Sequence, residues 1–131
     1  MEIGIKAEEI MNENFPLLDA SLSIEKCMEK LNRREEACVV IKKGTIECVL
    51  SYDELLKEIL KRKEKNLKLS KIKLKKNFVI IDKETDASDI IELMRKGINY
   101  IIVKDENRIG LITKKEIAEV NQLLFDLAYK S

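Results

Sequence analysis

Two short motifs in the sequence place a carboxylate three positions after a hydroxyl. Ser51 precedes Glu54, Thr113 precedes Glu116, and an apolar helical pattern begins immediately after each pair. At the start of a helix, a hydroxyl and a carboxylate with this spacing hydrogen-bond to backbone N–H groups that have no partner within the helix, which is the capping box. The chemistry that the motif itself predicts is hydrogen bonding at a helix N-terminus.

Catalysis by the common hydrolytic mechanisms is excluded by composition. The 131 residues include no His, so the chain has no imidazole base, no Ser–His or Cys–His pair and no mixed Cys/His zinc site. Cys27, Cys38 and Cys48 each lie within an apolar run, a pattern that indicates buried free thiols and fits neither a disulfide framework nor a zinc site. We expect a protein that is not an enzyme and requires no cofactor.

Charge is balanced over the whole chain but not along it. Lys and Arg total 25 against 24 Asp and Glu, which argues against binding a polyanion through bulk charge. Residues 57–76 are nevertheless strongly basic and contain no aromatic residue that could stack on a base. We therefore expect a solvated connector rather than a nucleic-acid site, with a basic lip over a phosphate-binding cleft as a compatible interpretation. Four apolar residues alternate here as in a half-buried strand: Leu67, Leu69, Ile72 and Leu74.

The sequence predicts a cytoplasmic protein with no membrane partner. Residues 1–14 contain no basic start, apolar run or small-residue cleavage site. No apolar stretch approaches the roughly 20 residues that span a bilayer.

An internal repeat organises the chain. The segment Asn14–Asp19 returns 63 positions later as Asn77–Asp82. The same offset relates two sets of apolar residues whose spacing places each set on one helical face. These sets are Ile24, Cys27, Met28 and Leu31 in the first copy, and Ala87, Ile90, Ile91 and Met94 in the second.

Each copy continues with two strands and a second helix. The strands are expected at 37–41 and 46–50 in the first copy, and at 98–103 and 109–112 in the second, each pair joined by turn residues. Each copy is then a β-α-β-β-α unit of the α+β class. One such unit cannot bury its sheet well alone, so we expect the two copies to pack as one pseudo-symmetric module. The expected boundaries are 4–62 for the first repeat, 63–76 for the basic connector and 77–131 for the second repeat.

This arrangement resembles a CBS-domain pair, also called a Bateman module. In the second copy, Gly97–Val103 is similar to the glycine-led strand of the family, and Gly110–Ile117 to its closing Gly-apolar-apolar-Thr-x-x-Asp motif. In the first copy, Lys6–Met11 resembles the short entry helix and Val49–Leu55 the closing motif. The resemblance covers about residues 4 to 122.

The resemblance implies a regulatory module rather than a catalyst. Similar pairs bind AMP, ADP, ATP or S-adenosylmethionine in clefts between the repeats, commonly form homodimers, and signal to a protein partner. A carboxylate can accept hydrogen bonds from both hydroxyls of a ribose, and a helix N-terminus attracts phosphate. The implied contacts are Glu116 and Glu54 for the ribose diol, Thr113 and Ser51 for ribose or phosphate, and Leu17, Ile80, Tyr100 and Leu111 for the cleft and the base.

The sequence departs from the family pattern at several of these positions. Glu replaces the usual ribose-binding Asp in both copies, and Glu47 and Arg34 stand where alignment at the 63-residue offset places Gly110 and Gly97 in the second copy. The capping boxes would also be needed in a CBS fold without a ligand. The alternative function is therefore a ligand-free dimerisation or interaction module with degenerate clefts.

Overall fold

The computed structural model describes the backbone of residues 2–31, 37–64 and 66–130, and the side chains of these ranges up to residue 122. The chain forms two compact units. One unit is Phe15–Asn77, and the other combines the N-terminal residues up to Asn14 with the chain from Phe78 onward.

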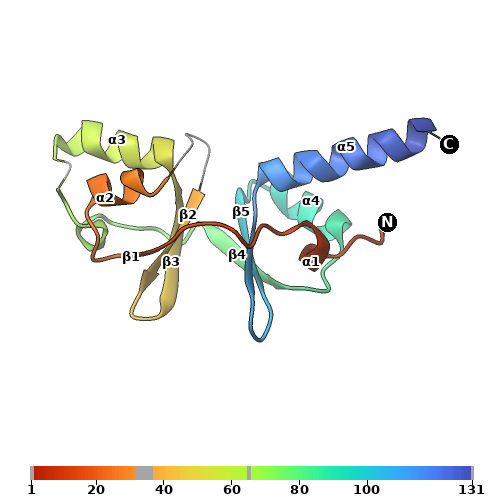
Figure 1. The fold of residues 1–131 in the computed structure, drawn as a ribbon, viewed down its shortest axis with the longest axis horizontal. Helices are drawn as coiled ribbons and strands as arrows, with labels where there is room; N and C mark the ends of the chain where they lie inside the picture. The colour runs from red at the N-terminus through yellow and green to blue at the C-terminus, as the bar shows by residue number, and fades with distance from the viewer. Residues whose placement is uncertain (1, 32–36, 65, 131) are drawn as a thin grey trace. The chain divides into compact units, whose positions relative to one another are not determined.

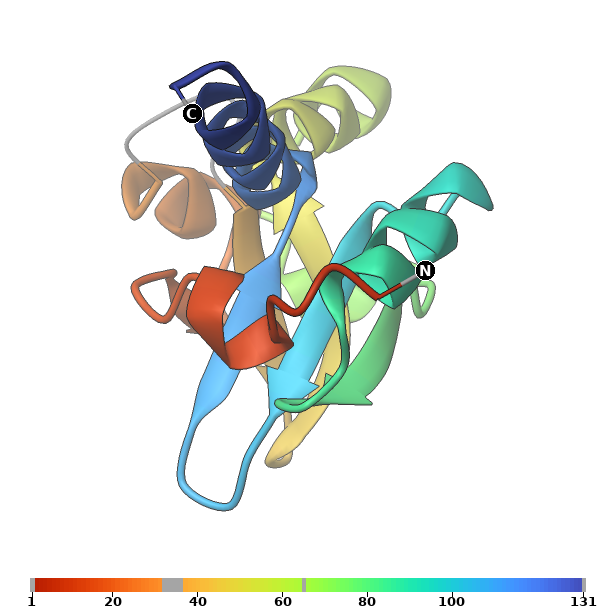
Figure 2. The same cartoon turned by 90° about the vertical axis from the view of Figure 1, so that its right-hand side faces the viewer.

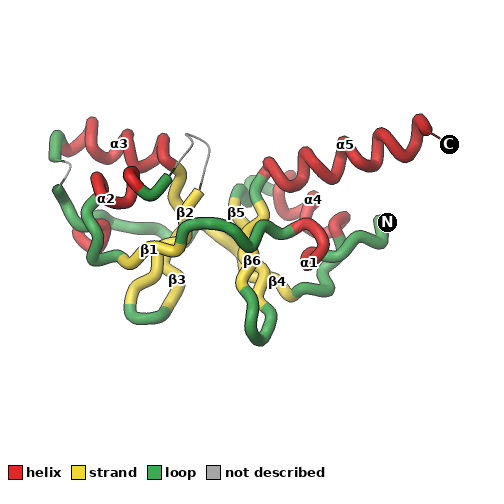
Figure 3. The backbone as a smooth tube through the Cα atoms, viewed as in Figure 1, coloured by secondary structure: helices red, strands yellow, loops and turns green. Residues whose placement is uncertain are grey.

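The Phe15–Asn77 unit contains the first three-stranded sheet (Figures 1 and 3). Strand β1 (Leu17–Asp19) pairs in parallel with β2 (Ala37–Lys42), which pairs antiparallel with β3 (Thr45–Ser51). Helix α2 (Ile24–Glu29) connects the two parallel strands, as a parallel pair requires, and α3 (Tyr52–Arg62) follows β3. The core combines residues of both helices and the sheet: Leu18, Ile24, Cys27, Cys38, Val40 and Leu55.

The other unit repeats this topology. Strand β4 (Phe78–Asp82) is parallel to β5 (Tyr100–Lys104), which is antiparallel to β6 (Ile109–Ile112). Helix α4 (Ala87–Arg95) joins the parallel strands, and α5 (Lys114–Lys130) follows β6 (Figure 2). The expected α+β fold with two β-α-β-β-α units is therefore confirmed. The buried core of this unit is formed by Ala7, Ile90, Ile101, Val103, Ile112 and Ile117.

The N-terminal segment packs in the unit of the second repeat, although the sequence repeat assigns it to the first. Helix α1 (Ala7–Ile10) buries Ala7 completely in that core. The Ala7 N–H donates to the Thr85 carbonyl at 2.8 Å, and the Asn12 N–H donates to the Leu111 carbonyl at 2.9 Å. Hydrogen bonds between residues so distant in sequence join the beginning of the chain to β6 and to the start of α4.

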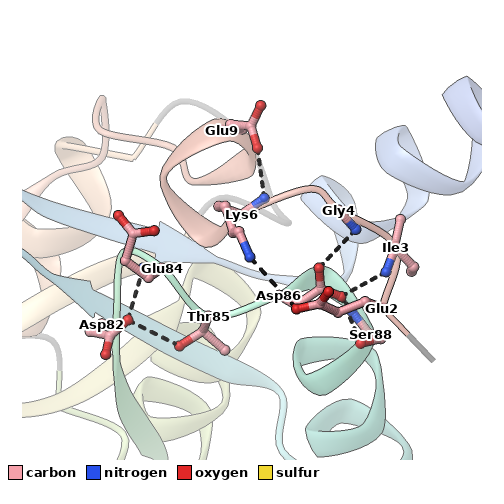
Figure 4. Close-up of polar contacts among 10 residues, drawn as sticks. All are labelled: Glu2, Ile3, Gly4, Lys6, Glu9, Asp82, Glu84, Thr85, Asp86 and Ser88. Carbon is pink, nitrogen blue, oxygen red and sulfur yellow. Dashed lines mark hydrogen bonds and ion pairs between the residues drawn. The ribbon is translucent and has the colours of Figure 1, made fainter.

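Asp86 ties this segment to helix α4 (Figure 4). The residue is 4% exposed. Its carboxylate accepts hydrogen bonds from the Ile3 N–H at 3.0 Å, the Gly4 N–H at 2.8 Å, and the Ser88 N–H and hydroxyl at 2.9 and 2.6 Å. The backbone N–H of Ile3, followed by the hydrogen bonds from Ser88, holds the pKa of Asp86 well below its usual range, because these donors stabilise the ionised form. Asp86 therefore caps α4 and holds the backbone of Ile3 and Gly4 beside the start of this helix.

The connector differs from the expected strand. It contains a 3₁₀ turn, η1 (Leu69–Lys71), because residues 67–70 follow the backbone of residues 20–24 instead of joining a sheet. The Leu69 N–H donates to the Leu22 carbonyl at 2.9 Å, and the Ser70 N–H donates to the Ala20 carbonyl at 2.8 Å. The expected half-burial is confirmed, since Leu69 and Ile72 are buried while Lys68, Lys71, Lys73, Lys75 and Lys76 are exposed.

The three cysteines are free and buried, as the sequence predicts. Burial raises the pKa of Cys27 to about 11 and those of Cys38 and Cys48 to about 12, so these thiols are protonated at neutral pH. Among the described residues, no group of three or more acidic, Cys or His side chains could hold a metal ion. None of the described helices is long and apolar enough to cross a membrane.

Candidate functional site

The motif of the first repeat forms a reciprocal capping box at the start of α3. Ser51 ends β3 in an extended conformation, and its Oγ accepts a hydrogen bond from the Glu54 N–H at 3.2 Å. Glu54 Oε1 accepts a hydrogen bond from the Ser51 N–H at 3.3 Å. Because both side chains hydrogen-bond to the helix start, the carboxylate of Glu54 is held beside the N-terminus of α3.

The second repeat uses its motif in a slightly different way. Glu116 Oε1 accepts hydrogen bonds from both the N–H and the hydroxyl of Thr113, at 2.7 and 2.8 Å. Thr113 Oγ1 in turn accepts a hydrogen bond from the Lys115 N–H at 3.2 Å. The Glu116 side chain is thus oriented by Thr113, and the residue as a whole is only 7% exposed.

The other oxygen of Glu116, Oε2, accepts no hydrogen bond from the described part of the chain. No buried side-chain oxygen or nitrogen among the described residues lacks a partner, so Oε2 has access to solvent. A carboxylate oxygen has two lone pairs and can accept from two donors. Glu116 can therefore cap α5 through Oε1 and still accept hydrogen bonds from a ligand through Oε2.

A cavity of about 350 Å³ lies beside Glu54, between β3, α3 and the end of the connector. This volume is at the lower end of the range found for small-molecule sites. The cavity combines apolar side chains, which can cover a flat ring, with three lysines, which can attract a phosphate. The apolar lining is Cys48, Leu50, Ile72 and Leu74, and the charged lining is Lys57, Lys73 and Lys75 with the acids Glu54 and Glu58.

Asn77 also lines this cavity, although neither the capping-box spacing nor the resemblance points to it as a site residue. Its side-chain amide donates to the Val49 carbonyl at 2.6 Å, and its Oδ1 accepts from the Val49 N–H at 2.9 Å. The pair of bonds fastens the end of the connector to β3 next to the cavity. The repetition of Asn14 as Asn77 is the signal in the sequence that marks this position.

The four apolar site residues lie on the sheets. Strand register places Ile80 and Leu111 opposite Ile102, and Tyr100 is two positions before Ile102, so the three predicted residues share one sheet face. Ile80 is 44% exposed, Tyr100 half-buried and Leu111 buried. In the other unit, Leu17 is 51% exposed on β1.

The predicted site residues thus fall into two groups. Leu17, Ser51 and Glu54 belong to the Phe15–Asn77 unit, whereas Ile80, Tyr100, Leu111, Thr113 and Glu116 belong to the other. Within each group, the hydroxyl and the acid are in contact, as their spacing predicts.

The expected replacement of Gly110 by Glu47 is wrong. Val40 pairs with Cys48 in the first sheet, and the equivalent Val103 pairs with Gly110 in the second. The register shifts directly after the first of these pairs, so Glu47 is the extra residue of a β-bulge and Cys48 occupies the position of Gly110. The extra residue explains why the offset between the copies falls from 63 at Val40 to 62 at Ser51, which matches Thr113. Arg34, the other departure at a glycine position, lies outside the described residues.

Gly110 is required by a close approach of the N-terminal segment. A Cβ atom at this position would overlap Met11 Sδ and would lie 2.6 Å from Met11 Cγ and 2.7 Å from Met11 Cβ. Both distances are far below van der Waals contact, so a side chain at position 110 would force Met11 to move.

Comparison with known proteins identifies the same family that the internal repeat indicates. The model of the CBS domain family matches residues 7–61 and 69–122. A Vibrio cholerae protein assigned to acetoin utilization has a similar structure, with a TM-score of 0.74, 16% identity and 97% of each chain covered.

Two further solved structures show the same fold. An uncharacterized conserved protein from Pyrococcus horikoshii has a TM-score of 0.71 and 16% identity, with 92% of this chain and 95% of that chain covered. A CBS-domain-containing protein from Agrobacterium tumefaciens has a TM-score of 0.69 and 15% identity, with 92% and 98% covered. A search of curated protein sequences finds no match. Since the family model matches both repeats and the fold agrees over nearly the whole chain, the protein belongs to the CBS domain family and is a CBS pair.

Proposed function

We propose that this CBS pair binds an adenosine nucleotide or S-adenosylmethionine and signals the bound state to a protein partner. The observation that carries the proposal is the cavity beside Glu54, where a carboxylate at a helix start, apolar side chains and lysines meet. These are the three kinds of group that a ribose, a base and a phosphate require.

The carboxylates are suited to the ribose diol. Glu54 and Glu116 are both held at helix starts by hydrogen bonds to the preceding hydroxyl residue. The solvent-accessible Oε2 of Glu116 can accept from the ribose hydroxyls without breaking the capping bonds at Oε1. Orientation of the acid before the ligand arrives reduces the entropy that binding must lose.

The lysines are suited to the phosphates. Lys73 and Lys75 line the cavity from the connector, and Lys57 lines it from α3. Each ammonium group can form charge-assisted hydrogen bonds with phosphate oxygens, which supports the role of a basic lip for this part of the connector. Among the candidate ligands, ATP and ADP would gain most from these lysines.

Regulation rather than catalysis is supported by the chemistry present. The sequence contains no His, all three thiols are buried, and the family match detects two CBS domains and no catalytic domain. A module of this kind acts by binding its ligand more tightly in one conformation than in another.

Calorimetric titration with AMP, ADP, ATP and S-adenosylmethionine tests the proposal. We expect saturable binding of at least one ligand. We also expect Lys73→Gln combined with Lys75→Gln to weaken ATP by about tenfold or more while adenosine binding changes little, because only phosphate loses its partners. Lys26→Gln, at an exposed lysine of α2, is the matched control. Absence of heat and of any thermal shift with all four ligands at about millimolar concentration would refute the proposal.

The second candidate is an interaction module without a ligand. The capping bonds favour it, because one oxygen of each acid already has a partner within its own helix. This candidate predicts self-association that does not change when any of the four ligands is added, measured by analytical ultracentrifugation.

A further inference from the structure

The connector carries a row of lysines on an extended segment. Residues 73–77 belong to no helix, turn or strand (Figure 3). Ile72 is buried and Leu74 is half-buried against the core of the Phe15–Asn77 unit. Lys71, Lys73 and Lys75, which alternate with them, are all exposed. This alternation is that of an extended chain, in which every second side chain lies on the same side, about 6–7 Å from the next. We call the three residues the lysine row.

The charge of the lysine row is not neutralised within the chain. In the ranges 2–31, 37–64 and 66–122, no carboxylate lies within ion-pair distance of these three ammonium groups. Glu58, which lines the adjoining cavity, is paired with Arg62 at 3.1 Å. The lysine row can therefore attract an anionic group of another molecule.

The backbone of the same segment also lacks partners. The N–H and C=O groups of Lys73, Leu74 and Lys75 form no hydrogen bond with any residue that the structure describes. An extended segment with unpaired backbone groups can accept an added strand from another protein. Side chains on one face of an added strand repeat at the same spacing of about 6–7 Å, so carboxylates at alternate positions would each face a lysine.

We propose that the lysine row docks an extended acidic segment of the protein partner, with carboxylates at alternate positions of that segment. Both observations favour this occupant, because the row supplies complementary charge and the backbone supplies strand pairing. A second copy of the segment would place lysines opposite lysines, which is destabilising. A single-stranded nucleic acid would find no aromatic side chain within residues 57–76 on which a base could stack.

The lysine row and the cavity beside Glu54 share two residues. Lys73 and Lys75 line the cavity, whereas Lys71 does not. Phosphates bound in the cavity and carboxylates of a docked segment then need the same two ammonium groups, so the two ligands exclude each other. This step rests on the proposed function, because it requires a nucleotide in the cavity. By linkage, nucleotide and partner weaken each other's binding by the same factor, and release of the partner is the signal.

Fluorescence anisotropy with a labelled peptide of four Glu-Thr repeats tests the docking. We expect saturable binding that weakens as salt concentration rises. Lys71→Glu should weaken binding by about fivefold or more, because it places like charges opposite each other. Lys26→Glu, which reverses an exposed charge on α2, is the matched control and should change the affinity by less than about twofold. A peptide of the same composition with its glutamates contiguous should bind about threefold more weakly, because its carboxylates no longer match the row.

Three variants separate the docking from nucleotide binding. Lys71→Glu should leave ATP binding unchanged in calorimetry, because Lys71 lies outside the cavity lining. Lys57→Gln, at a lysine that lines the cavity from α3, should weaken ATP and leave the peptide unchanged. The combination of Lys73→Gln and Lys75→Gln should weaken both ligands. In the wild type, saturating ATP should weaken the peptide by about tenfold.

The outcomes are distinguishable. Peptide binding without ATP binding contradicts the proposed function and leaves the docking intact, whereas ATP binding without peptide binding up to about millimolar protein overturns the docking. Equal effects of Lys71→Glu and Lys26→Glu, or tighter binding of a single-stranded RNA of the same charge, also overturn it. Simultaneous binding of peptide and ATP without mutual weakening overturns the competition. Circular dichroism of each variant separates loss of folding from loss of binding.

Discussion

At the scale of single residues, the polar contacts are directed at helix starts. Ser51, Thr113 and Asp86 each accept a hydrogen bond from the first turn of a helix. The carboxylates of Glu54 and Glu116 accept hydrogen bonds from the N–H groups of Ser51 and Thr113. The sequence predicts the local pairs, because their members are three positions apart. It does not predict the bonds from Ile3 and Gly4 to Asp86, because more than 80 residues separate them.

Glu116→Ala should lower the free energy of unfolding by about 1 kcal/mol, because the Thr113 N–H and hydroxyl lose their acceptor. Denaturant unfolding measures this change. The control is Glu119→Ala on the exposed side of α5, which we expect to change stability by less than about 0.5 kcal/mol. If Glu116→Ala is as stable as the control, the carboxylate does not stabilise the helix start.

Asp86→Asn should change how stability depends on pH. The folded protein holds the pKa of Asp86 below its unfolded value of about 3.9. The stabilisation from the ionised group is therefore complete above that pH and is lost as pH falls through the folded pKa. The wild type should lose stability below about pH 4 more steeply than the variant, and their unfolding midpoints should converge toward lower pH. Parallel curves from pH 6 to pH 2 would show that Asp86 is not responsible.

At the scale of elements, the close approach of the N-terminal segment to β6 explains why position 110 carries no side chain. The Asn12 N–H donates to the Leu111 carbonyl and the Leu111 N–H to the Asn12 carbonyl, each at 2.9 Å, and Met11 covers Gly110. The periodicity of apolar residues predicts the strands and helices of the two β-α-β-β-α units, but it predicts a strand in the connector where none forms. It does not predict the bulge at Glu47 or the 3₁₀ turn at Leu69–Lys71, because strand register and distant backbone partners decide both.

Gly110→Ala should destabilise the protein by about 1–3 kcal/mol, because the new methyl group overlaps Met11. Combining it with Met11→Ala should give a smaller loss than the sum of the two single changes, since the shorter side chain leaves room. A double-mutant cycle by denaturant unfolding measures this coupling. Strict additivity, or a Gly110→Ala variant with wild-type stability, would contradict the close approach.

At the scale of the whole molecule, two repeats of one α+β unit carry different charges on equivalent surfaces. Glu25 and Glu29 line the groove between α2 and α3 in the first repeat, whereas Arg95 and Lys114 line the groove between α4 and α5 in the second. The repeat and the family are visible in the sequence because they depend on local patterns. The sequence does not show that the first 14 residues belong to the unit of the second repeat, because that arrangement depends on packing.

The central claim is that the capping-box acids also bind an adenosine ligand. A ¹H–¹⁵N correlation spectrum of the labelled protein, titrated with AMP, ADP, ATP and S-adenosylmethionine, tests both binding and location. At least one ligand is predicted to shift the amide signals of residues 51–54, 73–77 or 113–116 in a saturable way, with the remainder of the spectrum little changed. Unchanged spectra with all four ligands at about millimolar concentration, or shifts confined to residues far from both capping boxes, would contradict the account.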